Sequence, residues 1–372
     1  MTLPPSDTLV RFEHVQDLRN DIADLFQVAD TTLDQPEQGF VRFRGRFLRD
    51  PADCFDDLRE RFERYGFTPK INEQDGLTAI VAMPYVFQPK ESNRVINYIL
   101  LFATILSTLF VGASYAANSV DEMFMLWRGW PFSLSIMLIL GAHEMGHYFA
   151  ARYHNVPVTL PYFIPMPAPG SFGTFGAFIQ LKAPVKNKRA LLDVGAAGPW
   201  AGILFAVPIL FIGLATSEVL PLPTAVAYQL EGNSILYAAM KYIVFGRFLP
   251  AGGVDVHLNQ VAWAGWVGLL VTSLNLIPVG QLDGGHVAFV LLGERAKLLF
   301  WPVIISLGTL VILTGTLTWV LWIGLLFFLG RRYAVPLDEV TQLDPRRRVF
   351  AILTLLLFFL VFIPIPLQIV IP

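Results

Sequence analysis

The amino-acid sequence predicts an α-helical polytopic membrane protein, with about six to seven transmembrane helices, one membrane-dipping hairpin and a small N-terminal α+β soluble domain. Of the 372 residues, 54% are hydrophobic and only 15% are charged, whereas soluble domains average about 25% charged residues. The charge is also unevenly placed, since residues 1–94 hold 12 of the 27 Lys and Arg. We therefore expect a soluble α+β domain over residues 1–90, on the cytoplasmic side, and a membrane-embedded domain over residues 91–372.

The N-terminal region has the pattern of a small α+β module. Residues 40–47 alternate apolar and polar side chains, which predicts a half-buried strand. Asp50 and Pro51 resemble an N-cap and a first helical residue, and a helix is expected over residues 52–65. Two short strands, over residues 69–72 and 78–84, are expected on either side of a turn at residues 73–76. The module contains no catalytic constellation, so we expect a docking or regulatory role.

Long apolar runs predict the transmembrane helices, because about 20 apolar residues cross the hydrocarbon core of a bilayer. Residues 299–330 would form a single helix of roughly 48 Å, which exceeds the core thickness of about 30 Å. A hairpin of two spans that turns near Gly315 is therefore preferred. The predicted spans are Val95–Ala117, Phe132–Tyr153, Leu191–Thr216, Val261–Gly280, the two within residues 299–330, and Val349–Ile371.

The basic residues of the loops predict the orientation of these spans. With the N-terminus inside, the inner loops contain twelve Lys and Arg and the outer loops contain three, at positions 128, 241 and 247. Such an excess marks the cytoplasmic side. The N-terminus shows no basic and apolar signal segment. We expect no cleaved signal and no transit peptide, which favours a bacterial plasma (inner) membrane with a cytoplasmic N-terminus.

The segment His143-Glu144-Met145-Gly146-His147 lies inside the second predicted span. Charged and ionisable residues at this depth are costly and indicate function. Positions i and i+4 share one face of a helix, so His143 and His147 can bind one metal ion. Glu144 points to the side, where it can act as a general base on water, and this H-E-x-x-H pattern is typical of zinc sites. Gly146 leaves room for close approach by another helix.

A catalytic zinc site usually has three protein ligands, and the segment from Asn275 to His286 offers candidates for the third. Pro278 and Gly280 break this segment, and irregular backbone at membrane depth is tolerated where it lines a cavity. Asp283 could reach the metal, or it could cap the following helix. His286 could be the third ligand instead, or it could lie beside the metal site. The amide of Asn275 could stabilise an oxyanion or position the substrate, or it could form an interhelical hydrogen bond.

Residues 160–181 are rich in Pro, Gly and Phe and carry no charge. This composition is too interrupted for a helix, so we expect a membrane-dipping hairpin near the metal. Its exposed edge could pair with an unwound substrate as an added strand. The alternative is a loop with a packing role only.

Together, the HEMGH motif, the Asn275–Gly284 segment and the order of the spans resemble the site-2 protease family of intramembrane zinc metalloproteases. Residues 161–165 and 170–178 resemble the subgroup that includes plastid and cyanobacterial-type members, and the N-terminal module is similar to the soluble extension of that subgroup. The resemblance implies Zn²⁺ held by His143, His147 and Asp283, with Glu144 as the catalytic base. It also implies that residues 91–372 form a membrane-embedded zinc protease domain, which carries out regulated intramembrane proteolysis of single-pass membrane proteins.

Two other classes of function are compatible with the same residues. A different zinc-dependent membrane hydrolase could use the same base and metal, and a non-enzymatic zinc transporter or scaffold could use the histidines alone. The net charge of −2 does not indicate a partner, and no basic stripe suggests nucleic acid, so the expected partners are the lipid bilayer and membrane proteins. Cys54 is the single cysteine, which excludes an intramolecular disulfide and a thiolate cluster.

Overall fold

The computed structural model describes residues 12–74, 76–89 and 91–370. Residues 1–11, where no signal segment was expected, lie outside these ranges, as do residue 75 of the predicted turn and Ile371 of the last predicted span. The chain divides into two compact units. The first comprises Met1–Lys90, Lys182–Leu191 and Val335–Asp344, and the second comprises Glu91–Leu181, Leu192–Ala334 and Pro345–Pro372.

A four-stranded antiparallel sheet and two helices form the first unit. Its strands follow the order β1-β2-β4-β3, and Phe43 of β2 lies opposite Ile80 of β4. The Asp50 side chain accepts a hydrogen bond from the amide of Ala52, so the predicted N-cap is confirmed. The elements are α1 (Phe12–Asp21), β1 (Phe26–Leu33), β2 (Val41–Phe47), α2 (Pro51–Arg64), β3 (Thr68–Gln74) and β4 (Leu77–Met83).

Two later segments of the chain complete the first unit. The amide of Ile71 in β3 donates to the carbonyl of Leu337 at 2.7 Å, and the amide of Glu339 donates back to the carbonyl of Ile71 at 3.0 Å. Leu337 is buried in the hydrophobic core of this unit. The amide of Leu337 donates in turn to the carbonyl of Val185 at 3.0 Å. The edge of β3 is therefore covered by the chain itself, which removes an exposed sheet edge.

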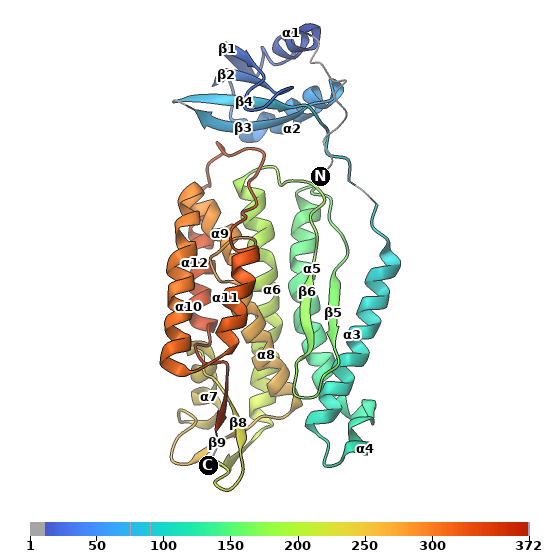
Figure 1. Ribbon diagram of the computed structural model, residues 1–372, viewed down its shortest axis with the longest axis vertical. Helices are drawn as coiled ribbons and strands as arrows, with labels where there is room; N and C mark the ends of the chain where they lie inside the picture. Colours follow the sequence, from blue (N-terminus) through green and yellow to red (C-terminus); the bar gives the residue numbers. More distant parts are fainter. Residues whose placement is uncertain (1–11, 75, 90, 371–372) are drawn as a thin grey trace. The chain divides into compact units, whose positions relative to one another are not determined.

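Helices dominate the second unit, with a β-hairpin beside them (Figure 1). The helices are α3 (Arg94–Tyr115), α4 (Val120–Met123), η1 (Leu126–Gly129), α5 (Trp130–Tyr153), α6 (Lys188–Ala215), α7 (Ile235–Phe245), α8 (Gln260–Asn275), α9 (Asp283–Leu292), η2 (Gly293–Leu299), α10 (Phe300–Thr314), α11 (Thr318–Leu329) and α12 (Pro345–Val361). The strands are β5 (Tyr162–Met166), β6 (Gly173–Phe178), β7 (Glu218–Pro221), β8 (Tyr228–Glu231), β9 (Val254–His257) and β10 (Leu367–Val370).

By length and apolar composition, three helical stretches of the described residues can cross a membrane. They are Arg94–Tyr115, Lys188–Ala215 and Asp283–Thr314. The third runs through α9, η2 and α10, so the helix begins well before residue 299, where a new span was predicted. It ends at Thr314. The next residue, Gly315, adopts a left-handed conformation, and α11 follows. The predicted break at Gly315 is confirmed, while the total of seven spans stays a prediction.

The prediction for the C-terminus was wrong in one respect. A span over Val349–Ile371 was expected, but α12 ends at Val361. Leu367–Val370 then form β10, which pairs antiparallel with β8. The two prolines at positions 364 and 366 explain the difference, because proline removes a backbone donor and cannot continue a helix.

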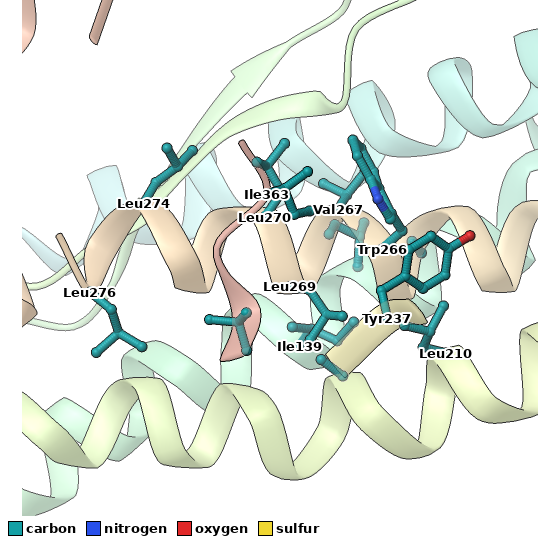
Figure 2. Close-up of a cluster of buried hydrophobic side chains, with 14 of the residues drawn as sticks. Ile139, Leu210, Tyr237, Trp266, Val267, Leu269, Leu270, Leu274, Leu276 and Ile363 are labelled. Atoms are coloured by element: carbon teal, nitrogen blue, oxygen red, sulfur yellow. The ribbon is translucent and has the colours of Figure 1, made fainter. Parts of the chain in front are cut away.

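The core of the second unit is built around α8. Leu269 and Leu270 of this helix lie among side chains from α5, α6, α7 and the segment after α12 (Figure 2). Glycines allow the close approach of α6 to α8, because a Cβ added at Gly265 would lie 2.7 Å from the Cα of Leu210. The hairpin of β5 and β6 lies against α3, and β6 also contacts α5. These contacts bring α5, α6, α8 and β6 together around one site.

Candidate metal centre

The HEMGH motif occupies the second half of α5. His143, Glu144 and His147 are buried there, with 3%, 4% and 6% of their surface exposed. The prediction that Gly146 permits close helix packing is confirmed, since a Cβ at this position would lie 2.5 Å from the carbonyl oxygen of Ala197 in α6. Helix α6 therefore covers the face of α5 beside the two histidines.

Asp283 reaches the same place through an irregular turn. Helix α8 ends at Asn275, and the chain reverses over residues 276–282 before α9 begins at Asp283. Gly284 and Gly285 make this reversal possible, because added Cβ atoms would lie 1.9 Å from the Leu276 carbonyl oxygen and 2.4 Å from that of Gly280. The N-cap of α9 is Leu282, and no side-chain hydrogen bond caps the helix. Asp283 thus faces the histidines rather than capping α9.

Three donor atoms form a nearly equilateral triangle. The Nε2 atoms of His143 and His147 are 3.2 Å apart, and each lies 3.3 Å from Oδ2 of Asp283. Zinc bonds of about 2.0–2.1 Å in tetrahedral geometry place neighbouring donors roughly 3.3–3.4 Å apart. The three residues therefore fit a zinc ion with its fourth position open, and they are the one such group found among the described residues.

His286 does not belong to this group. It lies in α9, one turn after Asp283, and its Nδ1 atom is buried without a hydrogen-bond partner among the described residues. A Cβ added at Gly195 would lie 3.0 Å from its Cβ atom, so α6 packs directly against it. His286 is therefore a neighbour of the donor group in the structure.

The orientation of His147 depends on the backbone of α6. Its Nδ1–H donates to the carbonyl oxygen of Val194 at a distance of 2.7 Å. This bond leaves the Nε2 lone pair directed at the other two donors, as is usual for metal-binding histidines. Gly198 and Gly202 give the two rings space, because added Cβ atoms would lie 2.0 Å from Nε2 of His147 and 3.1 Å from Nδ1 of His143.

Two further groups approach the centre. The backbone amide of Ile179, directly after β6, lies near the Glu144 carboxylate. The Nδ2 atom of Asn275 lies 3.3 Å from Nε2 of His143. The structure thus brings all five predicted site residues together, from α5, from the end of α8 and from the start of α9.

Sequence reasoning missed Val194 and Ile179, which act through backbone atoms that residue type does not reveal. The glycines of α6 did carry a usable signal. Gly195, Gly198 and Gly202 recur at three- and four-residue spacing on one side of an apolar helix, a pattern typical of close helix packing in membranes. That pattern could have placed α6 beside the HEMGH helix.

Comparison with known proteins agrees with this geometry. Residues 131–313 match the model of Peptidase family M50. The chain is 30% identical over 356 residues to "Probable zinc metalloprotease EGY2, chloroplastic" of Arabidopsis thaliana, covering 92% of this chain and 63% of that protein. It is also 30% identical over 245 residues to "Probable zinc metalloprotease EGY1, chloroplastic" of Oryza sativa subsp. japonica, covering 63% of this chain and 40% of that protein.

The chain therefore spans less than two thirds of the length of these relatives. No solved structure matches it significantly. The matched region contains the HEMGH motif, the Asn275–Asp283 segment and the three donor atoms, and the names of the relatives specify zinc. On this basis residues 131–313 are similar to peptidase family M50, and most of the chain is similar to plastid zinc metalloproteases.

Proposed function

We propose that this protein is an intramembrane zinc metalloprotease that cleaves single-pass membrane proteins within or near their transmembrane segments. The observation that carries the proposal is the triangle of His143, His147 and Asp283 with Glu144 beside it, on helices of an apolar, helical unit. A transporter would need ionisable groups along a path through several spans, whereas these donors meet at a single point. Glu144 adds a proton acceptor, which metal storage alone does not require.

His143, His147 and Asp283 would hold the zinc ion through Nε2, Nε2 and Oδ2. When bound, zinc supplies Lewis-acid polarisation of a carbonyl group and makes water more acidic. Glu144 is placed to accept a proton from the attacking water, whose oxygen adds to the scissile carbonyl carbon. Glu144 then delivers that proton to the amine that leaves as the C–N bond breaks, so that one water is consumed for each bond cut.

Asn275 is placed to act on the developing charge of the carbonyl oxygen. Its Nδ2 atom lies beside His143. A hydrogen bond donated from this amide to the substrate carbonyl oxygen would strengthen as that oxygen becomes an oxyanion.

The β5–β6 hairpin would present the substrate. The two strands form a sheet of their own, and the segment after β6 comes near Glu144 at Ile179. A peptide bond inside a helix is already hydrogen-bonded, so the substrate has to unwind before attack. Pairing of the unwound segment with this sheet would replace its lost hydrogen bonds and hold it in an extended form beside the base.

The loop charges support an orientation with the N-terminus on the cytoplasmic side, because twelve Lys and Arg fall in the loops of that side and three in the others. The relatives are named chloroplastic. A bacterial plasma membrane for this chain stays a prediction.

The proposal is tested by comparing membrane proteomes of cells that carry the active protein and cells that carry Glu144→Gln. We expect full-length single-pass proteins to accumulate in the variant cells, with their soluble fragments missing. Identical proteomes, with both proteins expressed equally and loaded with zinc, would rule out proteolysis of such substrates.

A further inference from the structure

A groove in the second unit lies apart from the metal centre. It has a volume of about 360 Å³, which is within the range of small-molecule sites of about 300–1,000 Å³. Helices α3 and α5 form its sides, and the residues that lead into β5 close it. Its lining is almost wholly apolar and includes Leu101, Ile105, Leu134, Leu138, Gly141 and Phe163.

The length of the groove matches half of a bilayer. Its α5 side runs from Leu134 to Met145, which corresponds to roughly 16 Å at about 1.5 Å per residue. One leaflet of the hydrocarbon core is about 15 Å deep. Gly141 widens the middle of the groove, since a Cβ added there would meet nothing within 4 Å.

One end of the groove carries a buried polar group. Asn97 of α3 lines it and is only 3% exposed. The Nδ2 atom of Asn97 donates to the carbonyl oxygens of Leu160 and Pro161, at 2.8 and 3.0 Å. Its Oδ1 atom is buried and has no hydrogen-bond partner among the described residues. An acceptor buried in this way is unfavourable until a donor reaches it.

We propose that this groove binds one acyl chain of a neutral lipid, whose headgroup hydroxyl donates a hydrogen bond to Oδ1 of Asn97. A substrate helix is too large, because a helix of this length and about 10 Å diameter has a volume on the order of 1,200 Å³. A single chain fits the measured space. The headgroup is neutral because no Lys or Arg lines the groove and the polar atom that lacks a partner is an amide acceptor.

The bound lipid would act as a packing partner of the HEMGH helix. Gly141 and His143 are two residues apart and therefore point to nearly opposite sides of α5. The lipid thus fills the side of the helix that the metal ligands leave free, and it contacts no atom of the donor group.

The test is lipid binding to the full chain, purified in detergent and measured by native mass spectrometry. The probe is 1-oleoylglycerol, and 1-oleoyl-lysophosphatidate has the same chain with a charged headgroup. We expect one 1-oleoylglycerol to bind per chain, at least tenfold more tightly than the charged lipid. Gly141→Leu and Leu138→Trp each fill the groove and should weaken binding at least tenfold. Leu356→Trp, on an exposed side of α12, should bind as the original protein does.

Equal binding by the original protein and both groove variants would overturn the proposal, since the lipid would then be part of the general annulus. Equal affinity for the two lipids would overturn the role of Asn97. Circular dichroism and zinc content confirm that each variant is folded. The measurement involves no cleavage, so its outcome is independent of the protease proposal.

Discussion

The Nδ1–H group of His147 donates to the backbone carbonyl oxygen of Val194 over 2.7 Å. A ligand on α5 is therefore oriented by the main chain of α6, and not by another side chain. The contact depends on how closely the two helices approach, and Gly198 sets that distance, because its missing Cβ would overlap the His147 ring. The geometry of the donor triangle thus rests on a helix that contributes no ligand.

Gly198→Ala tests this dependence directly. The added methyl group would lie 2.0 Å from Nε2 of His147, so the ring or the helix has to move. Loss of such supporting contacts costs about 10–100-fold in metal affinity, and we expect a loss of at least that size in zinc titrations. Gly308→Ala in α10, where a Cβ meets nothing within 4 Å, is the matched control. Unchanged zinc affinity in Gly198→Ala would show that α6 does not support the site.

Glu144→Gln distinguishes the role of Glu144 as general base from the binding of zinc. The amide keeps the size of the side chain but cannot accept a proton, so the cleavage rate should fall by at least the roughly 10²–10⁴-fold that general base catalysis contributes. Zinc should be retained at one ion per chain, because Glu144 is not among the three donors. A chelator should abolish activity in the original protein, and added zinc should restore it. An active Glu144→Gln protein would disprove the assigned role.

Asn275→Ala tests whether the Asn275 amide stabilises the oxyanion that forms during cleavage. If the amide stabilises the transition state, kcat should fall by about 10²–10³-fold, the cost of one oxyanion donor, while KM and zinc content change little. The Nδ2 atom is 3.3 Å from Nε2 of His143, so zinc content has to be measured in the same samples. A lower melting temperature with unchanged kcat would favour the alternative, in which Asn275 only joins helices.

Much of the site was predictable because its side chains follow helical spacing. His143 and His147 are one turn apart on a helix that is apolar, and the break at Pro278 and Gly280 was visible as residue types. The alternatives for Asp283 could not be decided, because the direction of the chain after Asn275 depends on the close contacts of Gly284 and Gly285 with backbone carbonyls. Those contacts form only in the folded chain, so local sequence patterns do not reveal them.

The fold was predictable where a pattern was long. Strand β2 and helix α2 lie within a residue or two of their predicted bounds. Helix α1 and strand β1 were not predicted, since β1 (FQVADTTL) carries Asp and Thr in place of a clear alternation. The C-terminal strand β10 was predicted as part of a transmembrane helix, because its apolar residues are compatible with either a strand or a membrane helix. Pairing with β8 decides its structure.

A buried ionic cluster near α7 predicts a large effect on stability. Lys241 is fully buried and bonds to Glu231 at 3.0 Å and to Asp255 at 3.3 Å. Lys241→Met would leave two buried carboxylates without a cation, which should cost about 3–5 kcal/mol. Lys297→Met, which removes an exposed ion pair with Glu294, should cost about 1 kcal/mol or less. The free energy of unfolding of both variants can be measured in detergent. Equal losses in the two variants would show that the buried cluster stabilises the fold no more than the exposed ion pair does.

Proline substitutions in β6 test strand addition of the substrate. Proline removes one backbone donor and fits only at φ near −65°, so Gly173 and Gly176, with φ of 73° and 100°, are unsuitable. Phe175→Pro, Ala177→Pro and Phe178→Pro sample both sets of alternating amides. If the substrate pairs with this strand, at least one set should lower cleavage tenfold or more with zinc retained.

Phe175→Ala keeps the amide and removes a side chain that is 71% exposed. It should therefore retain more activity than Phe175→Pro, because strand pairing depends on main-chain hydrogen bonds more than on side chains. The Glu144 contact is left intact in all of these variants, since it comes from the amide of Ile179. Full cleavage by every proline variant would exclude strand addition, and the hairpin would then have a packing role beside the catalytic base.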